Sequence, residues 1–178
     1  FTVTVSDGDL IDTQLVTVMI NAVNDTPIAT ADIIGTTPEG TSVSIALSGS
    51  DVDGDVLTFT SFSEPTNGTL EISGSYATYT PNDYFNGDDS FTFAVSDGQE
   101  SDTATVTLTV TAVNDAPVLA EVLDIAFDED GIGSTDLSAT DIDGDDLTYS
   151  ITDGIDISAI LDVDTNTVSF SAPDNYNG

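Results

Sequence analysis

The chain has 178 residues, of which 33 are Asp or Glu and none is Lys, Arg or His, so its formal net charge at pH 7 is −33. Nucleic acids and anionic lipid surfaces would repel such a chain, and we exclude both as partners. Hydrophobic residues make up 39% of the sequence, which allows a core and argues against a disordered acidic tail. No apolar run is long enough to insert into a membrane, and the absence of Cys leaves the redox compartment open.

The acidic residues have no side-chain cation to pair with. Two carboxylates about 4 Å apart repel each other by roughly 4 kcal/mol at an effective dielectric constant near 20. Acidic groups that lie close together therefore need a bound metal ion, protonation or separation.

Residues 1–23 are predicted to form a hairpin. Phe1–Val5 alternates apolar and polar residues, Ser6-Asp7-Gly8 makes a turn, and residues 15–20 resume a β-rich run. The pattern returns in residues 91–113, at an offset of 90 residues, so the chain is a tandem repeat. We interpret residues 1–23 as the C-terminal hairpin of a preceding repeat.

Residues 24–114 are predicted to form a complete repeat. The repeat opens with Asn24-Asp25-Thr26-Pro27, and Asn114-Asp115-Ala116-Pro117 marks the next junction, where proline keeps the chain extended. Short runs with strand character and no helical period predict an all-β fold, a Greek-key sandwich of the immunoglobulin-like type with about seven strands per repeat. The expected strands are 28–34, 41–47, 56–62, 69–73, 75–80, 91–95 and 103–113, with a long crossing loop from Pro81 to Ser90.

Residues 115–178 are predicted to form an incomplete repeat. Strands are expected at 134–140, 147–152, 157–161 and 167–171, and residues 174–178 match the motif at 82–87 with one insertion. The closing hairpin is missing, and residues 1–23 of another copy are one way to supply it, in a head-to-tail contact that would propagate as a fibre. The other interpretation is that the sequence is a window of a longer repeat chain. We expect it to be an internal piece in either case.

Two copies of an Asp-x-Asp-Gly-Asp loop begin at Asp51 and Asp141, each between two expected strands. In an immunoglobulin-like sandwich this loop lies at the same pole as the incoming linker, so oxygen ligands should converge on each junction. Ca²⁺ takes six to eight oxygens at about 2.3–2.6 Å, whereas Mg²⁺ demands a tighter octahedron and zinc prefers His and Cys. The expected Ca²⁺ ligands are Asp51, Asp53 and Asp55, which face Asn24 and Asp25; Asp141, Asp143 and Asp145, which face Asn114 and Asp115; and Glu39, Asp88 and Asp89, which approach the second junction from the domain before it.

The same loops have a plainer interpretation as solvated turns, in which Asp caps backbone amides and Gly takes a positive φ. They are not EF-hands, because the glycine is the fourth residue rather than the sixth. Two copies at a fixed spacing, each with an Asn-Asp linker, favour the metal. For Asp7, Asp12, Asp97 and Asp102, turn chemistry alone is a sufficient explanation.

Several of these strings resemble a known family. The segment from Ser138 to Asp145, the linker at Asn114 and the pair Pro38-Glu39 look like the calcium motifs of cadherin repeats. The strings 91–98 and 79–87 resemble the cadherin-like tandem repeats of giant bacterial surface adhesins. The resemblance implies an extracellular, calcium-rigidified repeat that is not catalytic. The linker carries a single Asn-Asp pair where cadherins have a denser acidic linker, which leaves the number of ions per junction open.

An enzyme is not expected, because without His, Cys or Lys a Ser nucleophile has no ordinary base. The triplets at Asn24 and Asn67 fit the N-glycosylation pattern, which is frequent by chance. Four aromatic residues form either a sugar-stacking platform or part of the core, and we favour the core. They are Tyr76, Tyr79, Tyr84 and Phe85.

The sequence thus predicts an extracellular structural repeat at a cell surface, from a calcium-rigidified adhesin stalk or a surface filament. Its expected partners are neighbouring repeats or identical copies arranged head to tail. The alternative is a cadherin-like module that binds carbohydrate or a cell surface. An exposed row of aromatic residues on one sheet would favour that alternative, and tyrosines buried between the sheets would favour the stalk.

Overall fold

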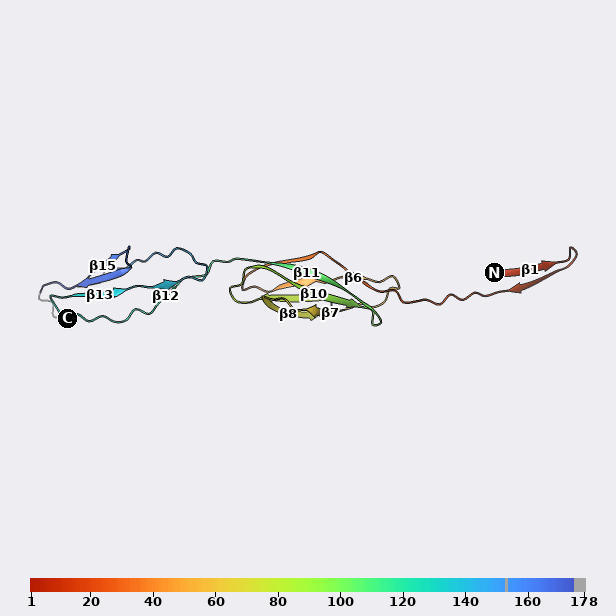
Figure 1. The fold of residues 1–178 in the computed structure, drawn as a ribbon, viewed down its shortest axis with the longest axis horizontal. Coiled ribbons are helices and arrows are strands. Elements are labelled where there is room, and N and C mark those ends of the chain that lie inside the picture. The colour runs from red at the N-terminus through yellow and green to blue at the C-terminus, as the bar shows by residue number, and fades with distance from the viewer. Residues whose placement is uncertain (153, 175–178) are drawn as a thin grey trace. The chain divides into compact units, whose positions relative to one another are not determined.

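The computed structural model describes residues 1–152 and 154–174. Within these ranges the regular secondary structure consists of β-strands, with no helix (Figure 1). The motif predicted at 174–178 lies outside the described residues apart from Asp174. Residue contacts divide the chain into two compact units, Phe1–Thr111 (unit 1) and Ala112–Gly178 (unit 2). In the described part of the chain, no helix has the length and apolar character needed to cross a membrane.

Unit 1 begins with the predicted hairpin, formed by β1 (Thr2–Ser6) and β2 (Ile11–Leu15). The second strand is shorter than expected, because residues 16–20 are not part of a strand. The turn between the strands is closed by Asp7, whose carboxylate accepts the N–H groups of Asp9 and Leu10 at 2.9 and 2.8 Å. These hydrogen bonds are the turn chemistry that the sequence suggested for Asp7.

The rest of unit 1 is an immunoglobulin-like β-sandwich. One sheet has the order β4-β11-β10-β7, in which β4 and β11 are parallel and the other neighbours are antiparallel. The opposing sheet has the order β5-β9-β8, and a short pair joins β3 to β6. The strands are β3 (Ile28–Ala29), β4 (Ile33–Pro38), β5 (Val43–Ala46), β6 (Gly49–Ser50), β7 (Thr58–Ser63), β8 (Gly68–Ser73), β9 (Tyr76–Pro81), β10 (Gly87–Ser96) and β11 (Ser101–Thr111).

Two details of unit 1 differ from the sequence prediction. The first strand is divided, since Asp32 adopts a positive φ of 58° between β3 and β4, and the two pieces join different sheets. The predicted crossing loop is also shorter, because β10 already begins at Gly87 and pairs with the end of β11. Pairing with β11 extends the strand beyond its apolar run.

The core of unit 1 follows from the alternation of β10 and β11, whose buried positions recur every second residue. Phe91, Phe93, Val95, Val106 and Leu108 face the opposing sheet and are almost fully buried. A core of this size accounts for the sandwich without disulfides.

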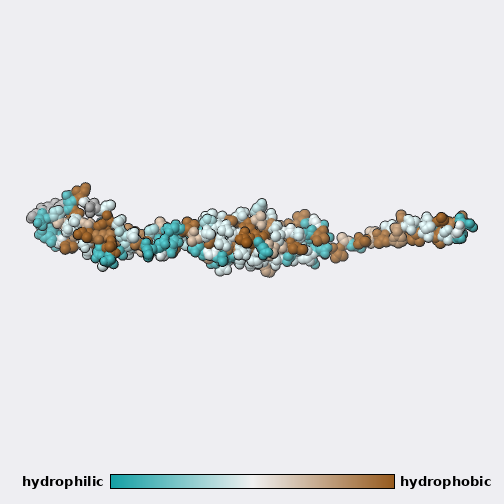
Figure 2. All heavy atoms as spheres, turned by 90° about the horizontal axis from the view of Figure 1, so that it is seen from above, coloured by the Kyte–Doolittle hydropathy of each residue, from teal (hydrophilic) through white to brown (hydrophobic). Residues whose placement is uncertain are grey.

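Unit 2 contains a smaller set of strands: β12 (Val118–Leu119) pairs with β14 (Ala139–Thr140), and β13 (Ile132–Asp136) and β15 (Ser158–Asp162) flank β16 (Thr167–Ser171). The strand predicted at 147–152 is wrong, because these residues have no ladder partner and form no strand. Among the described residues of unit 2, Val168 is the one hydrophobic residue that is buried. Apolar atoms accordingly lie on the surface of this unit (brown, at the left of Figure 2).

Candidate metal site at the acidic loops

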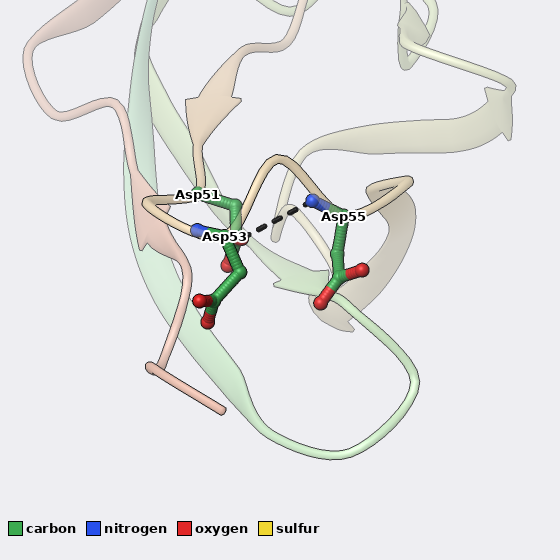
Figure 3. A group of neighbouring side chains, drawn as sticks. All are labelled: Asp51, Asp53 and Asp55. Atoms are coloured by element: carbon green, nitrogen blue, oxygen red, sulfur yellow. Dashed lines mark hydrogen bonds between the residues drawn. The ribbon is translucent and has the colours of Figure 1, made fainter. Parts of the chain in front are cut away.

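The first acidic loop follows β6 and is closed around Asp51. One carboxylate oxygen of Asp51 accepts the N–H of Asp53 at 2.9 Å and the N–H of Asp55 at 3.2 Å. Gly54 takes a φ of +79°, a conformation that a side chain would strain. The turn therefore places the carboxylates of Asp53 and Asp55 on the same side of the loop (Figure 3).

The three carboxylates of this loop form a cluster. Asp51, Asp53 and Asp55 each offer a ligand oxygen, and these oxygens lie within 4.8 Å of one another, which no other trio of acidic residues in the described chain achieves. Asp53 and Asp55 are exposed, whereas Asp51 is half-buried and its second oxygen, Oδ2, is buried without a hydrogen-bond partner. Oxygens bound to one Ca²⁺ at about 2.3–2.6 Å can lie up to about 5 Å apart. The donor set and its spacing therefore fit Ca²⁺.

The linker meets this loop in the way the sequence predicted. The N–H of Asp25 donates to Oδ2 of Asp53 at 2.8 Å. The side-chain amide of Asn24 donates to Oδ2 of Asp97 at 2.9 Å and accepts a hydrogen bond from Gln99 at 2.7 Å. The linker, the acidic loop and the turn between β10 and β11 thus lie together at one pole of the sandwich.

The turn between β10 and β11 is held by Asp97. Its Oδ1 accepts the N–H groups of Gln99 and Glu100 at 2.6 and 2.7 Å. The N–H of Glu100, the amide of Asn24 and the N–H of Gln99 together lower the pKa of Asp97 below its ordinary value. Sequence reasoning explained Asp97 as a turn residue but missed its bond to Asn24, which joins residues 73 positions apart.

The second acidic loop, in unit 2, repeats the hydrogen bonds of the first, but its carboxylates do not converge within 4.8 Å of one another as those of the first loop do. Asp141 accepts the N–H groups of Asp143 at 3.0 Å and Asp145 at 3.2 Å, and Gly144 again has a φ of +79°. The N–H of Asp115 donates to Oδ2 of Asp143 at 2.7 Å. The linker-to-loop contact therefore occurs twice, as the repeat predicts.

Asp89 lies instead among backbone amides. Its Oδ1 accepts the N–H groups of Thr66 and Ser90 at 3.0 and 2.8 Å, while Oδ2 accepts the N–H of Asn67 at 2.8 Å and the hydroxyl of Tyr79 at 3.0 Å. Burial alone would raise the pKa of Asp89, but these donors outweigh it and hold the pKa below its ordinary value. Burial and the Asp89 carboxylate raise the pKa of Tyr79. Through these hydrogen bonds Asp89 connects the start of β10 to Tyr79 of β9 and to the segment before β8.

Asp88 and Glu39, which the sequence assigned to the second junction together with Asp89, lie in different surroundings. Asp88 is exposed and accepts a hydrogen bond from the hydroxyl of Thr109 at 3.2 Å, and Glu39 is buried. The assignment of Glu39, Asp88 and Asp89 to the second junction stays a prediction. The pair of Tyr79 and Asp89 was not predicted, because one was interpreted as core and the other as a ligand.

The sandwich places the chain in the immunoglobulin-like and cadherin-like fold class, which confirms the resemblance noted in the sequence at the level of the fold. More specifically, residues 24–109 match the family model of the bacterial Ig domain. No curated protein matches the chain.

Solved structures with a similar fold include cadherins and a glycoside hydrolase. Drosophila N-cadherin EC1-4 matches 87% of this chain and 43% of its own with 16% identity and a TM-score of 0.50. Human protocadherin-24 EC1-2 matches 84% of this chain and 79% of its own with 16% identity and a TM-score of 0.47. An endo-fucoidan hydrolase of glycoside hydrolase family 107 matches 98% of this chain with 21% identity and a TM-score of 0.46, and the chain spans 30% of its length.

Proposed function

We propose that the chain is a structural repeat of an extracellular adhesin stalk or surface filament, in which Ca²⁺ stiffens the junctions between successive domains. The observation that carries the proposal is the repeated contact between an acidic loop and an Asn-Asp linker, made by Asp53 and Asp25 in one unit and by Asp143 and Asp115 in the other. The proposed role is mechanical rather than catalytic.

The charge of the chain supports a bound cation. Asp51, Asp53 and Asp55 converge in a protein that has no Lys, Arg or His to offset them. An oxygen-only donor set of irregular geometry suits Ca²⁺ better than Zn²⁺ or Mg²⁺. The proposed ligands are Asp51, Asp53 and Asp55 with Asn24 and Asp25 at the first linker, and Asp141, Asp143 and Asp145 with Asn114 and Asp115 at the second.

A bound Ca²⁺ would offset most of the charge of the three carboxylates in a loop and add its own bonds to those that already join linker and loop. The linker would then be fixed to the domain that follows it, because the N–H of Asp25 is already held by Asp53 at 2.8 Å. Restricted linkers are what a stalk needs in order to keep successive domains extended. Junction rigidity, rather than domain stability alone, is therefore the proposed function of the metal.

The test is thermal unfolding in 10 mM Ca²⁺, in 10 mM Mg²⁺ and in chelator. With dissociation constants of about 10⁻⁴–10⁻³ M, typical of extracellular modules, each site should add about 1.4–2.7 kcal/mol in 10 mM Ca²⁺. Asp55→Asn and Asp145→Asn should reduce the effect, whereas Glu71→Gln, an exposed change on β8 with the same loss of charge, should not. Equal unfolding temperatures in Ca²⁺ and chelator would contradict the proposal.

The carbohydrate-binding alternative rests on two exposed tyrosines. Tyr76 on β9 and Tyr84 in the crossing loop are each 57% exposed, whereas Tyr79 is fully buried, as the stalk interpretation expects. Tyr76→Ala with Tyr84→Ala would weaken retention on immobilised acidic or neutral polysaccharides if these rings stack on sugar. If the parent chain is not retained, or if the double variant is retained equally well, the carbohydrate-binding alternative is excluded and the structural function is the one that remains.

A further inference from the structure

The sequence has three Asn-Gly pairs, two of which lie in the part of the chain that the structure describes, Asn67-Gly68 and Asn86-Gly87. In such a pair the backbone nitrogen of the glycine can attack the side-chain amide carbon of the asparagine, because glycine has no side chain to hinder the approach. An intramolecular attack of this kind needs a backbone that can bring the two atoms into reacting geometry. The surroundings of each pair therefore decide whether it reacts.

The backbone around Asn67 is fixed by hydrogen bonds. Its N–H donates to Oδ2 of Asp89 at 2.8 Å, and its carbonyl oxygen accepts the N–H of Asn82 at 2.8 Å. Both residues of the pair are half-buried, and Gly68 is the first residue of β8. Ring closure would rotate the peptide between them, so the carbonyl oxygen of Asn67 would lose its hydrogen bond to Asn82.

The space around Gly68 is closed as well. A Cβ at Gly68 would overlap the ring of Tyr79 and would lie 2.6 Å from the carbonyl oxygen of Thr80. The backbone of Gly68 thus lies directly against β9, with which every residue of β8 is paired. The peptide cannot turn unless this end of β8 separates from β9. We therefore expect Asn67-Gly68 to react only through local opening of the sandwich.

Asn86-Gly87 has neither restraint. Both residues are exposed, and among the described residues no group forms a hydrogen bond with the side chain of Asn86. A Cβ at Gly87 would meet nothing closer than the ring of Phe85 at 3.8 Å. Asn86 precedes β10, and Gly87 lies opposite Val110 at the end of the ladder, where local opening is easiest. The peptide between Asn86 and Gly87 can therefore turn without disturbing the core.

We propose that Asn86 is a site of spontaneous modification, at which the chain loses an amide and gains a carboxylate. The backbone nitrogen of Gly87 attacks Cγ of Asn86 and forms a C–N bond. The bond from Cγ to Nδ2 breaks, and this nitrogen leaves as ammonia with the proton from the Gly87 amide. Water then opens the succinimide ring: addition at Cγ gives aspartate, and addition at the main-chain carbonyl carbon gives isoaspartate. Water is the one co-reactant, and nothing is oxidised or reduced.

The position of Asn86 sets the consequence for the fold. Its side-chain amide makes no hydrogen bond in the described chain, so its loss removes none. The new carboxylate lies close in sequence to Asp88, which is exposed, in a chain whose net charge is already −33. Isoaspartate also adds a methylene to the main chain just before β10, outside the ladder. The modified chain should therefore stay folded and carry an additional negative charge.

The test follows the two sites separately while the folded chain is incubated at mildly alkaline pH, where the glycine amide is deprotonated more readily. Trypsin has no Lys or Arg to cleave at, but an endoproteinase that cleaves before Asp releases residues 55–82 and residues 83–87. Each pair thus lies in its own peptide, and mass spectrometry measures the fraction in which OH has replaced NH₂. Aspartate at position 86 also creates a new cleavage site, whereas isoaspartate does not, which distinguishes the two products.

We expect Asn86 to react faster than Asn67 in the folded chain by about ten- to 150-fold. This factor corresponds to breaking the hydrogen bond from Asn67 to the charged Asp89 carboxylate during local opening, which is about ten- to 150-fold in rate. In the urea-unfolded chain the two pairs have the same chemistry and should react at similar rates. The comparison separates the effect of the structure from that of the Asn-Gly sequence.

Two matched variants assign the product. Asn86→Gln should remove most of the modification of the folded chain, because ring closure through the longer side chain is slower. Asn67→Gln should leave it unchanged. In the described chain the side-chain amides of Asn67 and Asn86 make no hydrogen bond, so both variants should fold, which circular dichroism checks.

The incubations are run in chelator, so the outcome does not depend on the proposed Ca²⁺ sites. Equal rates at Asn67 and Asn86 in the folded chain would overturn the proposal. Modification of Asn86 that occurs only after unfolding in urea would overturn it as well, because it would show that the folded backbone protects this pair too.

Discussion

Substitution of Asp89 by Asn tests how much the hydrogen bonds of Asp89 contribute to the stability of the sandwich in unit 1. Asp89 is 9% exposed, and its two oxygens accept four hydrogen bonds, three of them from backbone N–H groups. In Asp89→Asn one oxygen becomes an NH₂ group, which cannot accept and which faces an N–H donor. A hydrogen bond to a charged group contributes about 1.5–3 kcal/mol, so we expect a loss of about 2–3 kcal/mol in the free energy of unfolding.

Thermal unfolding followed by circular dichroism measures this loss. A change of 1 kcal/mol shifts the melting temperature of a 60–100-residue domain by about 4–8 °C, so the transition of unit 1 should fall by roughly 8–24 °C. The matched control is Asp88→Asn, because Asp88 is the exposed neighbour on the same strand and loses the same charge. Its effect should stay within about 0.5 kcal/mol.

The control separates two explanations of opposite sign. In a chain of net charge −33, removal of any carboxylate relieves repulsion and should stabilise the fold slightly. The local hydrogen bonds of Asp89 predict destabilisation instead. Melting temperatures that rise equally in Asp88→Asn and Asp89→Asn would refute the reasoning, because they would show that net charge outweighs the bonds of Asp89.

Two further predictions concern the same region. Gly68→Ala should cost about 2–4 kcal/mol, because a Cβ at this position would lie 2.3 Å from the ring of the buried Tyr79 and 2.6 Å from the carbonyl oxygen of Thr80; an unchanged midpoint in a urea titration would contradict this. The second prediction concerns pH. Since the pKa of Asp89 is lowered by folding, its contribution is complete above the ordinary carboxyl pKa of about 3.9 and is lost as pH falls through the lower folded value. The difference in stability between the parent chain and Asp89→Asn should therefore be constant from about pH 5 to pH 7 and shrink below about pH 4, as measured by urea titrations at each pH.

The sequence predicts the sandwich well because its apolar alternation is long and its repeat is regular. Residues 91–95 and 103–111 carry apolar side chains at every second position, and both lie within the longest strands of the structure, β10 and β11. The junction geometry also follows from sequence, since the pole assigned to each loop depends only on the order of the strands. The bond between Asp25 and Asp53 confirms that step.

What escapes the sequence is long-range pairing of single residues. The sequence does not show that the Asp89 carboxylate accepts hydrogen bonds from Tyr79 and from the amides of Thr66 and Asn67. These groups come together only when the crossing loop is folded. The interruption of the predicted first strand at Asp32 could not be predicted from sequence either. Asp32 has a positive φ because the strands on either side of it, β3 and β4, join different sheets. Both failures concern tertiary context rather than local preference.

The contrast between residues 57–60 and 147–150 makes this dependence explicit. Leu-Thr-Phe-Thr and Leu-Thr-Tyr-Ser have the same alternation and nearly the same strand propensity, yet only the first lies in a strand, which begins at Thr58. The difference is the partner, because β10 supplies the ladder that residues 147–150 lack. Strand formation here is therefore a consequence of completing the sandwich.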